Sequence, residues 1–174
     1  MTCNFRLERL TVWFVYDDLY LPQTVRGPAM WNDLIGRLYD DAQFAASASE
    51  EEIDQIERRL GQRVPTQLRE LLRESNGIQD QYGSGLVWSV QQIIERNEEF
   101  RRRADFAELY MSFEQLMFVG DNGGGDQFAH VRVPAAPDDV FVWDHETDDR
   151  KWVAGSLQDY LERRAASVGD DWYR

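Results

Sequence analysis

The sequence predicts an α+β fold, with a mainly antiparallel sheet and helices packed on one side of it. Three observations support this fold class. Helical patterns fill the chain from residue 29 to residue 103. From Leu116 onward, short apolar runs alternate with Gly, Asp and Pro, which is typical of strands joined by turns. A last helical pattern follows these strands, and this order differs from the strict alternation that builds a parallel α/β sheet.

The best-defined helix is expected to begin just after Ser49. Glu52 stands three residues later, which is the pattern of a capping box. Gly61 occupies the position at which a left-handed residue commonly ends a helix. Apolar residues repeat on one face between these ends, and they are Ile53, Ile56 and Leu60.

The same reasoning predicts four other helices. One covers residues 29–44, where apolar residues recur at helical spacing, and one begins at Pro65 and ends before Asn76. Capping residues open the other two, at residues 89–103 and 156–166. Residues 78–85 contain two glycines and are expected to form a turn.

The N-terminal residues are expected to form an appendage to one domain. A chain of 174 residues favours a single domain, which we place at residues 29–174. Residues 1–28 form an extension with an extra strand near residues 7–16 and a loop. The apolar run in this extension is too short for a signal peptide, and no window approaches a membrane span. A cytoplasmic protein that does not enter membranes is therefore expected.

The net charge of −13 limits the partners of this chain. It has 32 acidic residues against 19 Lys and Arg. Such a chain is poorly suited to nucleic acid, since neutralised phosphates supply most of that affinity, and it favours cationic partners instead. The single cysteine, Cys3, excludes a disulfide within the chain and a cysteine-based zinc site.

A glycine-rich stretch at residues 120–126 is the most conspicuous short motif. It follows a predicted strand, but it lacks the Gly-Lys-Ser/Thr ending of a phosphate loop and runs into another strand. A calcium loop with oxygen ligands from Asp121, Asn122 and Asp126 is an alternative, although the bidentate Glu of an EF-hand is missing. The favoured interpretation is a structural turn, and its glycines are Gly123, Gly124 and Gly125.

The chain offers little for catalysis. Its two histidines, His130 and His145, fall in or beside predicted strands, and no nucleophile motif accompanies them. A small metal-dependent hydrolase would need both histidines to converge with Asp121 and Asp126 in a cleft. We therefore expect no catalytic residue, no metal ligand and no cofactor.

Acidic pairs and runs are the other functional candidates. One run, at residues 50–52, is explained by the helix dipole, and plain solvation is the ordinary explanation for the others, including the pair at residues 40–41. The functional alternative is electrostatic steering of a basic protein partner. The candidate residues lie in the strand-rich half, with a tryptophan as aromatic anchor: Asp138, Asp139, Asp144, Glu146, Asp148, Asp149 and Trp152. Trp143 is expected to be part of the core instead.

An ordered set of sequence elements resembles the SUKH superfamily, which contains Smi1-type cell-wall regulators and many bacterial toxin-immunity proteins. The elements in the helical half are Ile53 with Glu57, Leu60-Gly61, Val64-Pro65 and Asn76-Gly77. Downstream, the runs FVGDNGGGDQFAH, VFVWDHET and SLQDYLE resemble the hairpin, strand end and closing helix of the family. The resemblance covers roughly residues 29–166.

The resemblance implies a non-enzymatic domain that binds another protein. For this chain it implies an immunity protein that neutralises a cognate toxin, and the acidic charge favours a basic, nuclease-like one. A Smi1-type regulatory scaffold that binds cellular partners is the alternative, and the small hydrolase is a second one. The family has no fixed catalytic residues to transfer to this sequence.

Overall fold

The computed structural model describes residues 31–132, 137–167 and 172–174. The expected N-terminal extension and its strand at residues 7–16 lie outside these ranges. The predicted α+β class is confirmed, because six helices and two antiparallel sheets occupy the described residues. The helices are α1 (Trp31–Leu38), α2 (Glu50–Leu60), α3 (Thr66–Glu74), α4 (Val90–Arg102), α5 (Ala104–Leu109) and α6 (Leu157–Ala166).

The strands form a small sheet and a larger one. The strands of the small sheet, in spatial order, are β1 (Gln43–Phe44), β2 (Ile78–Gln79) and β3 (Gly85–Val87). The larger sheet is a meander of β4 (Leu116–Asp121), β5 (Gln127–Val131), β6 (Val140–Trp143) and β7 (Arg150–Ala154). The amide of Trp88, just after β3, donates a 2.7 Å hydrogen bond to the carbonyl of Val119 in β4, so the two sheets adjoin.

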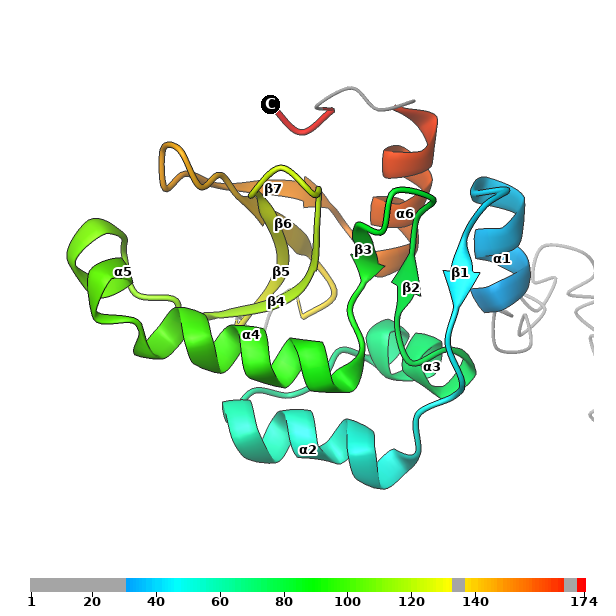
Figure 1. The fold of residues 1–174 in the computed structure, drawn as a ribbon, viewed down its shortest axis with the longest axis horizontal. Coiled ribbons are helices and arrows are strands. Elements are labelled where there is room, and N and C mark those ends of the chain that lie inside the picture. The colour runs from blue at the N-terminus through cyan, green and yellow to red at the C-terminus, as the bar shows by residue number, and fades with distance from the viewer. Residues whose placement is uncertain (1–30, 133–136, 168–171) are drawn as a thin grey trace, which may run out of the picture.

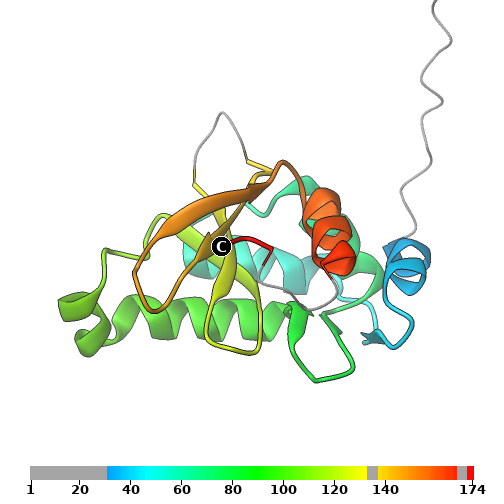
Figure 2. The same cartoon turned by 90° about the horizontal axis from the view of Figure 1, so that it is seen from above.

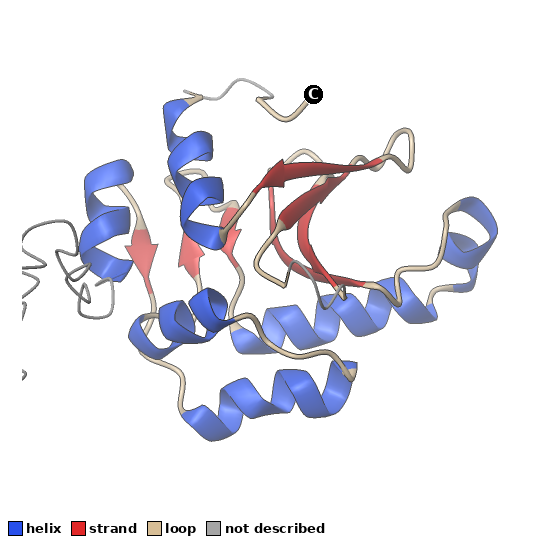
Figure 3. Ribbon diagram, turned by 180° about the vertical axis from the view of Figure 1, so that it is seen from behind, coloured by secondary structure: helices blue, strands red, loops and turns tan. Residues whose placement is uncertain are grey.

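Helices pack against both edge strands of the curved four-stranded sheet. Figures 1 and 3 show α4 running beneath β4 and α6 standing beside β7, with α2 packed on the far side of α4. These three helices pack in this way because each of them buries an apolar stripe of side chains. In α2 this stripe is the predicted one, and Ile53, Ile56 and Leu60 are all buried.

The predicted caps of α2 are present. The Ser49 side chain accepts a hydrogen bond from the amide of Glu52, and the Glu52 carboxylate accepts one from the amide of Ser49. Gly61 ends the helix in the left-handed conformation, with φ of 64°. The same reciprocal box, made by Ser89 and Gln92, opens α4.

Three local expectations were wrong. The first helix ends at Leu38 instead of Phe44, because residues 40–41 turn the chain into β1. The expected turn at residues 78–85 contains β2 and the start of β3, which are too short to show a strand periodicity. Helix α5 was missed because none of its residues is buried, so it has no apolar stripe.

None of the helices in the described ranges has the length and apolarity needed to cross a bilayer.

Candidate functional site

The glycine-rich stretch joins β4 to β5 in a tight turn. Gly123 and Gly125 have positive φ values of 76° and 120°, whereas Gly124 does not. The Oδ1 atom of Asn122 accepts hydrogen bonds from the amides of Gly124 (2.8 Å) and Asp126 (3.0 Å), which closes the turn from inside. The side chain of Asn122 thus stabilises the backbone of the turn in which it lies.

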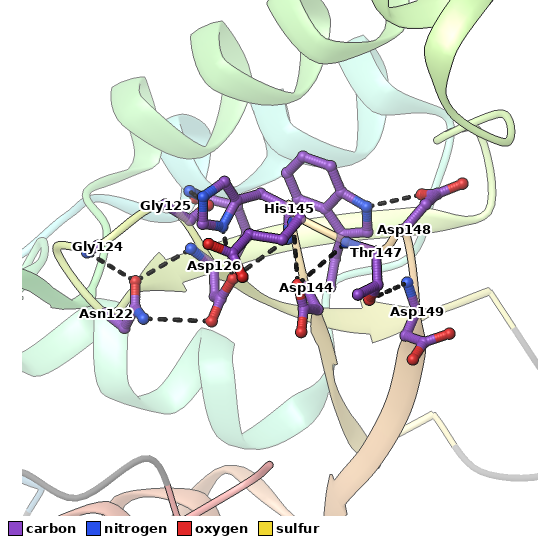
Figure 4. A network of polar contacts seen from close by, with 12 residues as sticks. Asn122, Gly124, Gly125, Asp126, Asp144, His145, Thr147, Asp148 and Asp149 are labelled. Atoms are coloured by element: carbon purple, nitrogen blue, oxygen red, sulfur yellow. Dashed lines mark hydrogen bonds and ion pairs between the residues drawn. The ribbon is translucent and has the colours of Figure 1, made fainter.

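A buried carboxylate, Asp126, lies at the centre of a polar network (Figure 4). Its Oδ1 accepts hydrogen bonds from the amide of His145 at 3.1 Å and from the Nδ1 of the same residue at 2.7 Å. Its Oδ2 accepts from the Tyr173 hydroxyl at 2.9 Å, the Arg174 guanidinium at 3.2 Å and the Asn122 amide at 3.4 Å. Burial alone would raise the pKa of Asp126, but the hydrogen bonds, first of all those from His145, lower this pKa below its ordinary value.

Gly125 allows His145 to approach this carboxylate. A Cβ atom at position 125 would lie 2.7–2.8 Å from three atoms of the His145 ring, closer than real Cβ contacts. The glycine therefore serves the packing of the β6–β7 turn against the β4–β5 turn, in addition to its positive φ. Hydrogen bonds to Asp126 thus connect these two turns with the C-terminal residues.

The acidic run between β6 and β7 divides into structural and exposed residues. Asp144 is 8% exposed, and its Oδ1 accepts hydrogen bonds from the amides of Glu146 and Thr147. Asp148 has an unusual positive φ of 60°, and its Oδ1 accepts a 2.7 Å hydrogen bond from the indole of Trp143. Its Oδ2 accepts from the amide of Met111 at 2.7 Å, so this aspartate fastens the segment after α5 to the turn.

The remaining acidic candidates lie at two ends of β6. Glu146 and Asp149 are exposed in the β6–β7 turn, and Asp149 pairs with Lys151 at 3.5 Å. Asp138 and Asp139 precede β6, which at ~3.3 Å per residue places them roughly 13 Å from that turn. The fold therefore places the acidic candidate residues in two groups, one at each end of β6.

The two tryptophans differ in exposure. Trp143 is 2% exposed and packs among phenylalanine rings, as expected of a core residue. Trp152 in β7 is 49% exposed, and the Arg163 guanidinium lies 5.5 Å from its ring centre. Trp152 is thus the one candidate residue that offers a large apolar surface to a partner.

The four residues of the hydrolase hypothesis do not form one site. Asp126 and His145 are in contact, but Asp121 accepts a 2.6 Å hydrogen bond from the Trp88 indole. His130 is 1% exposed near the other end of β5, where its Nδ1 contacts the Asp139 carbonyl at 3.1 Å. The histidines therefore belong to different surroundings, and no acid, base and nucleophile converge among the described residues.

One side-chain group has metal-like spacing. Ligand atoms of Asp126, Asp144 and His145 lie within 4.8 Å of one another. Both Asp126 oxygens and the Oδ1 of Asp144 accept hydrogen bonds from the protein, so three of the four carboxylate oxygens have donors within the fold. The sequence did not predict this network, since Asp126 and Tyr173 are 47 residues apart and only folding brings them together.

The fold and this network define an α+β domain in which the polar cluster joins two turns and does not resemble a catalytic centre. A protein-family model, that of the SMI1/KNR4 family (SUKH-1), matches residues 47–163, well over half of the chain. The chain belongs to this family. No curated protein matches the chain. The family is generally non-catalytic, its members bind protein partners, and it includes immunity proteins.

Proposed function

We propose that this protein is an immunity protein that binds and neutralises a basic, nuclease-like toxin. The observation that carries the proposal is Trp152, a half-exposed aromatic side chain in the edge strand of a sheet. Exposed carboxylates of the β6–β7 turn precede it by a few residues. An aromatic anchor within a charged surround is a common arrangement for interface hot spots.

The charges support a basic partner. Glu146 and Asp149 are not required by the turn in the way that Asp144 and Asp148 are, so their carboxylates remain at the surface. With a net charge of −13, the chain attracts a cationic protein over several ångströms and speeds its association. Family membership supports a protein partner in general, and toxin neutralisation is the finer step that we propose.

Co-expression with the product of any toxin gene that neighbours this one tests the proposal. We expect the full chain to bind that toxin and to restore growth. Trp152→Ala should weaken binding by roughly 10-fold or more, which is the loss expected of a hot-spot residue. Phe44→Ala removes a similarly exposed aromatic ring (41%) from the other sheet and serves as the matched control.

The association rate tests the contribution of the surface charges separately. Glu146→Gln with Asp149→Asn should slow association and reduce its dependence on salt, with little effect on dissociation. Failure of the neighbouring toxin to bind, or binding without neutralisation, would refute the immunity function. A non-toxin partner bound through Trp152 would instead favour the regulatory scaffold.

A further inference from the structure

A groove of about 1140 Å³ opens on the surface, and Trp152 is not one of its lining residues. Its walls are the turn after α1, the turn between β2 and β3, the turn between β4 and β5, and the end of α6 with the C-terminal residues. Figure 2 shows the two strand turns projecting on the same side of the molecule. The polar network of Asp126 does not fill this groove, although Asn122 and Tyr173 line it.

The groove is lined by more negative than positive charge. Among the lining residues that the structure describes, four carboxylates, Asp40, Asp41, Asp80 and Asp121, accompany two guanidinium groups. Two of these carboxylates are used by the fold: Asp80 accepts from the amides of its own turn, and Asp121 accepts from the Trp88 indole. Asp40 and Asp41 are exposed, and no hydrogen bond or ion pair to their side chains is found in the described part of the chain.

The two guanidinium groups of the groove are already engaged. Arg164 is largely buried, and its Nη1 donates to the Asp121 carbonyl at 2.8 Å and to the Tyr160 hydroxyl at 2.7 Å. Asp80 lies 3.7 Å from the same guanidinium. Arg96 stacks over Trp88 at 5.6 Å from the ring centre. The carboxylates of Asp40 and Asp41 are therefore left to attract a cation from outside.

Aromatic rings in the groove suit a guanidinium more than an ammonium. Tyr82, at the tip of the β2–β3 turn, is 84% exposed, the largest value among the exposed apolar side chains of the described residues. The stacking of Arg96 on Trp88 shows that the groove already holds a guanidinium against a ring. Guanidinium groups stack on aromatic faces while they bind carboxylates, and a compact, strongly hydrated ammonium does so less well.

We propose that this groove binds an extended, arginine-containing segment of a protein partner. A guanidinium of the partner would bind Asp40 and Asp41 and stack on Tyr82. Internal hydrogen bonds hold two of the turns that form the site: the Asp80 carboxylate accepts from the amides of Tyr82 and Ser84, and the Asp121 carboxylate accepts from the Trp88 indole. Little ordering is then required when the ligand binds. The inference does not require the partner to be a toxin.

An NMR titration of the full ¹⁵N-labelled chain tests the groove. The probe is a 12-residue peptide of alternating arginine and glycine, and the control peptide has glutamate in place of arginine. We expect the arginine peptide to shift the amide signals of residues 40–42, 80–85 and 121–123. The glutamate peptide should leave these signals unchanged.

Two variants with the same change in charge make the test specific. Asp40→Asn with Asp41→Asn should weaken peptide binding about three- to tenfold (~0.7–1.4 kcal/mol), since two exposed ion pairs of ~0.2–1 kcal/mol each are lost. Glu51→Gln with Glu108→Gln removes the same charge from exposed positions outside the groove and should change the affinity less than about twofold. Tyr82→Ala should also weaken binding, because it removes the exposed ring.

Equal losses in the two double variants, or shifts centred outside the groove, would overturn the inference. In that case a toxin that is still neutralised would leave the proposed function intact. Conversely, specific peptide binding by a chain that neutralises no toxin would support the groove and refute the immunity function.

Discussion

Protonation of His130 should destabilise the fold in mild acid. The ring is buried on β5, and its Nδ1 contacts the carbonyl oxygen of Asp139. A carbonyl oxygen can only accept, so the proton of the neutral ring is on Nδ1. The Nε2 atom is buried and has no hydrogen-bond partner among the described residues, so a proton added there would find no acceptor. Burial therefore lowers the pKa of His130 from 6.5 to about 4.

The size and sign of the effect follow from this pKa. Between pH 6.5 and 4 the unfolded chain binds a proton at this histidine, and the folded chain does not. The free energy of unfolding must then fall as the pH falls through this window, and the loss levels off below pH 4. A shift of this size, at ~1.4 kcal/mol per unit, corresponds to a loss of about 3 kcal/mol.

Two measurements check this prediction. Urea unfolding of the wild type and of His130→Leu at several pH values should give a stability difference that decreases by about 3 kcal/mol from pH 7.5 to 4, since the contributions of the other groups cancel. In NMR spectra, the histidine ring signal that is missing from His130→Leu should not titrate above pH 5. A midpoint near 6.5 for that signal, or a stability difference independent of pH, would refute the burial argument.

Three other substitutions test the network and the helix caps by urea unfolding at pH 7. Asp126→Asn should cost roughly 2–4 kcal/mol, because donors around a buried carboxylate lose their acceptor, and this cost should shrink as the pH falls through the lowered pKa of Asp126. Gly125→Ala should cost roughly 1–3 kcal/mol, from its φ of 120° and its collision with His145. Ser49→Ala should cost about 1 kcal/mol through the lost cap. The exposed Asp149→Asn, as control, should stay within about 0.5 kcal/mol, and equal losses in Asp126→Asn and Asp149→Asn would contradict the central role of Asp126.

The parts of the fold that were predictable from sequence are those with local causes. Helix α2 was predicted to within a residue, because its capping box, apolar stripe and terminal glycine all lie within thirteen residues of one another. Strands β4 to β7 were predicted from apolar runs bounded by turn residues. By contrast, β1 and β2 are two residues long each, and they exist as strands through pairing with each other and with β3. Such pairing leaves no periodic trace in the sequence.

The candidate site was less predictable, because a carboxylate looks the same in sequence whether it is solvated or buried. Asp144 and Asp148 were selected with Glu146 and Asp149 as members of one acidic run. In the fold, Asp144 caps its own turn and Asp148 accepts a hydrogen bond from Trp143. The hydrogen bond between Asp148 and the amide of residue 111 joins positions 37 residues apart, so no local sequence pattern predicts it.

The acidic composition therefore has several different physical roles, and these decide where a cationic partner can bind. Carboxylates such as that of Asp126 are neutralised by donors inside the protein and carry little field outward. In the first turn of α2, the carboxylates interact with the helix, and that of Glu50 also pairs with Arg69 and Arg73 of α3. Carboxylates without such partners include those of Asp40 and Asp41, which line the same groove as an exposed tyrosine, and that of Glu146 in the turn that leads to Trp152. Within the described part of the chain, these two places combine unpaired carboxylates with exposed aromatic rings, so the charge favours binding there over the other described acidic segments.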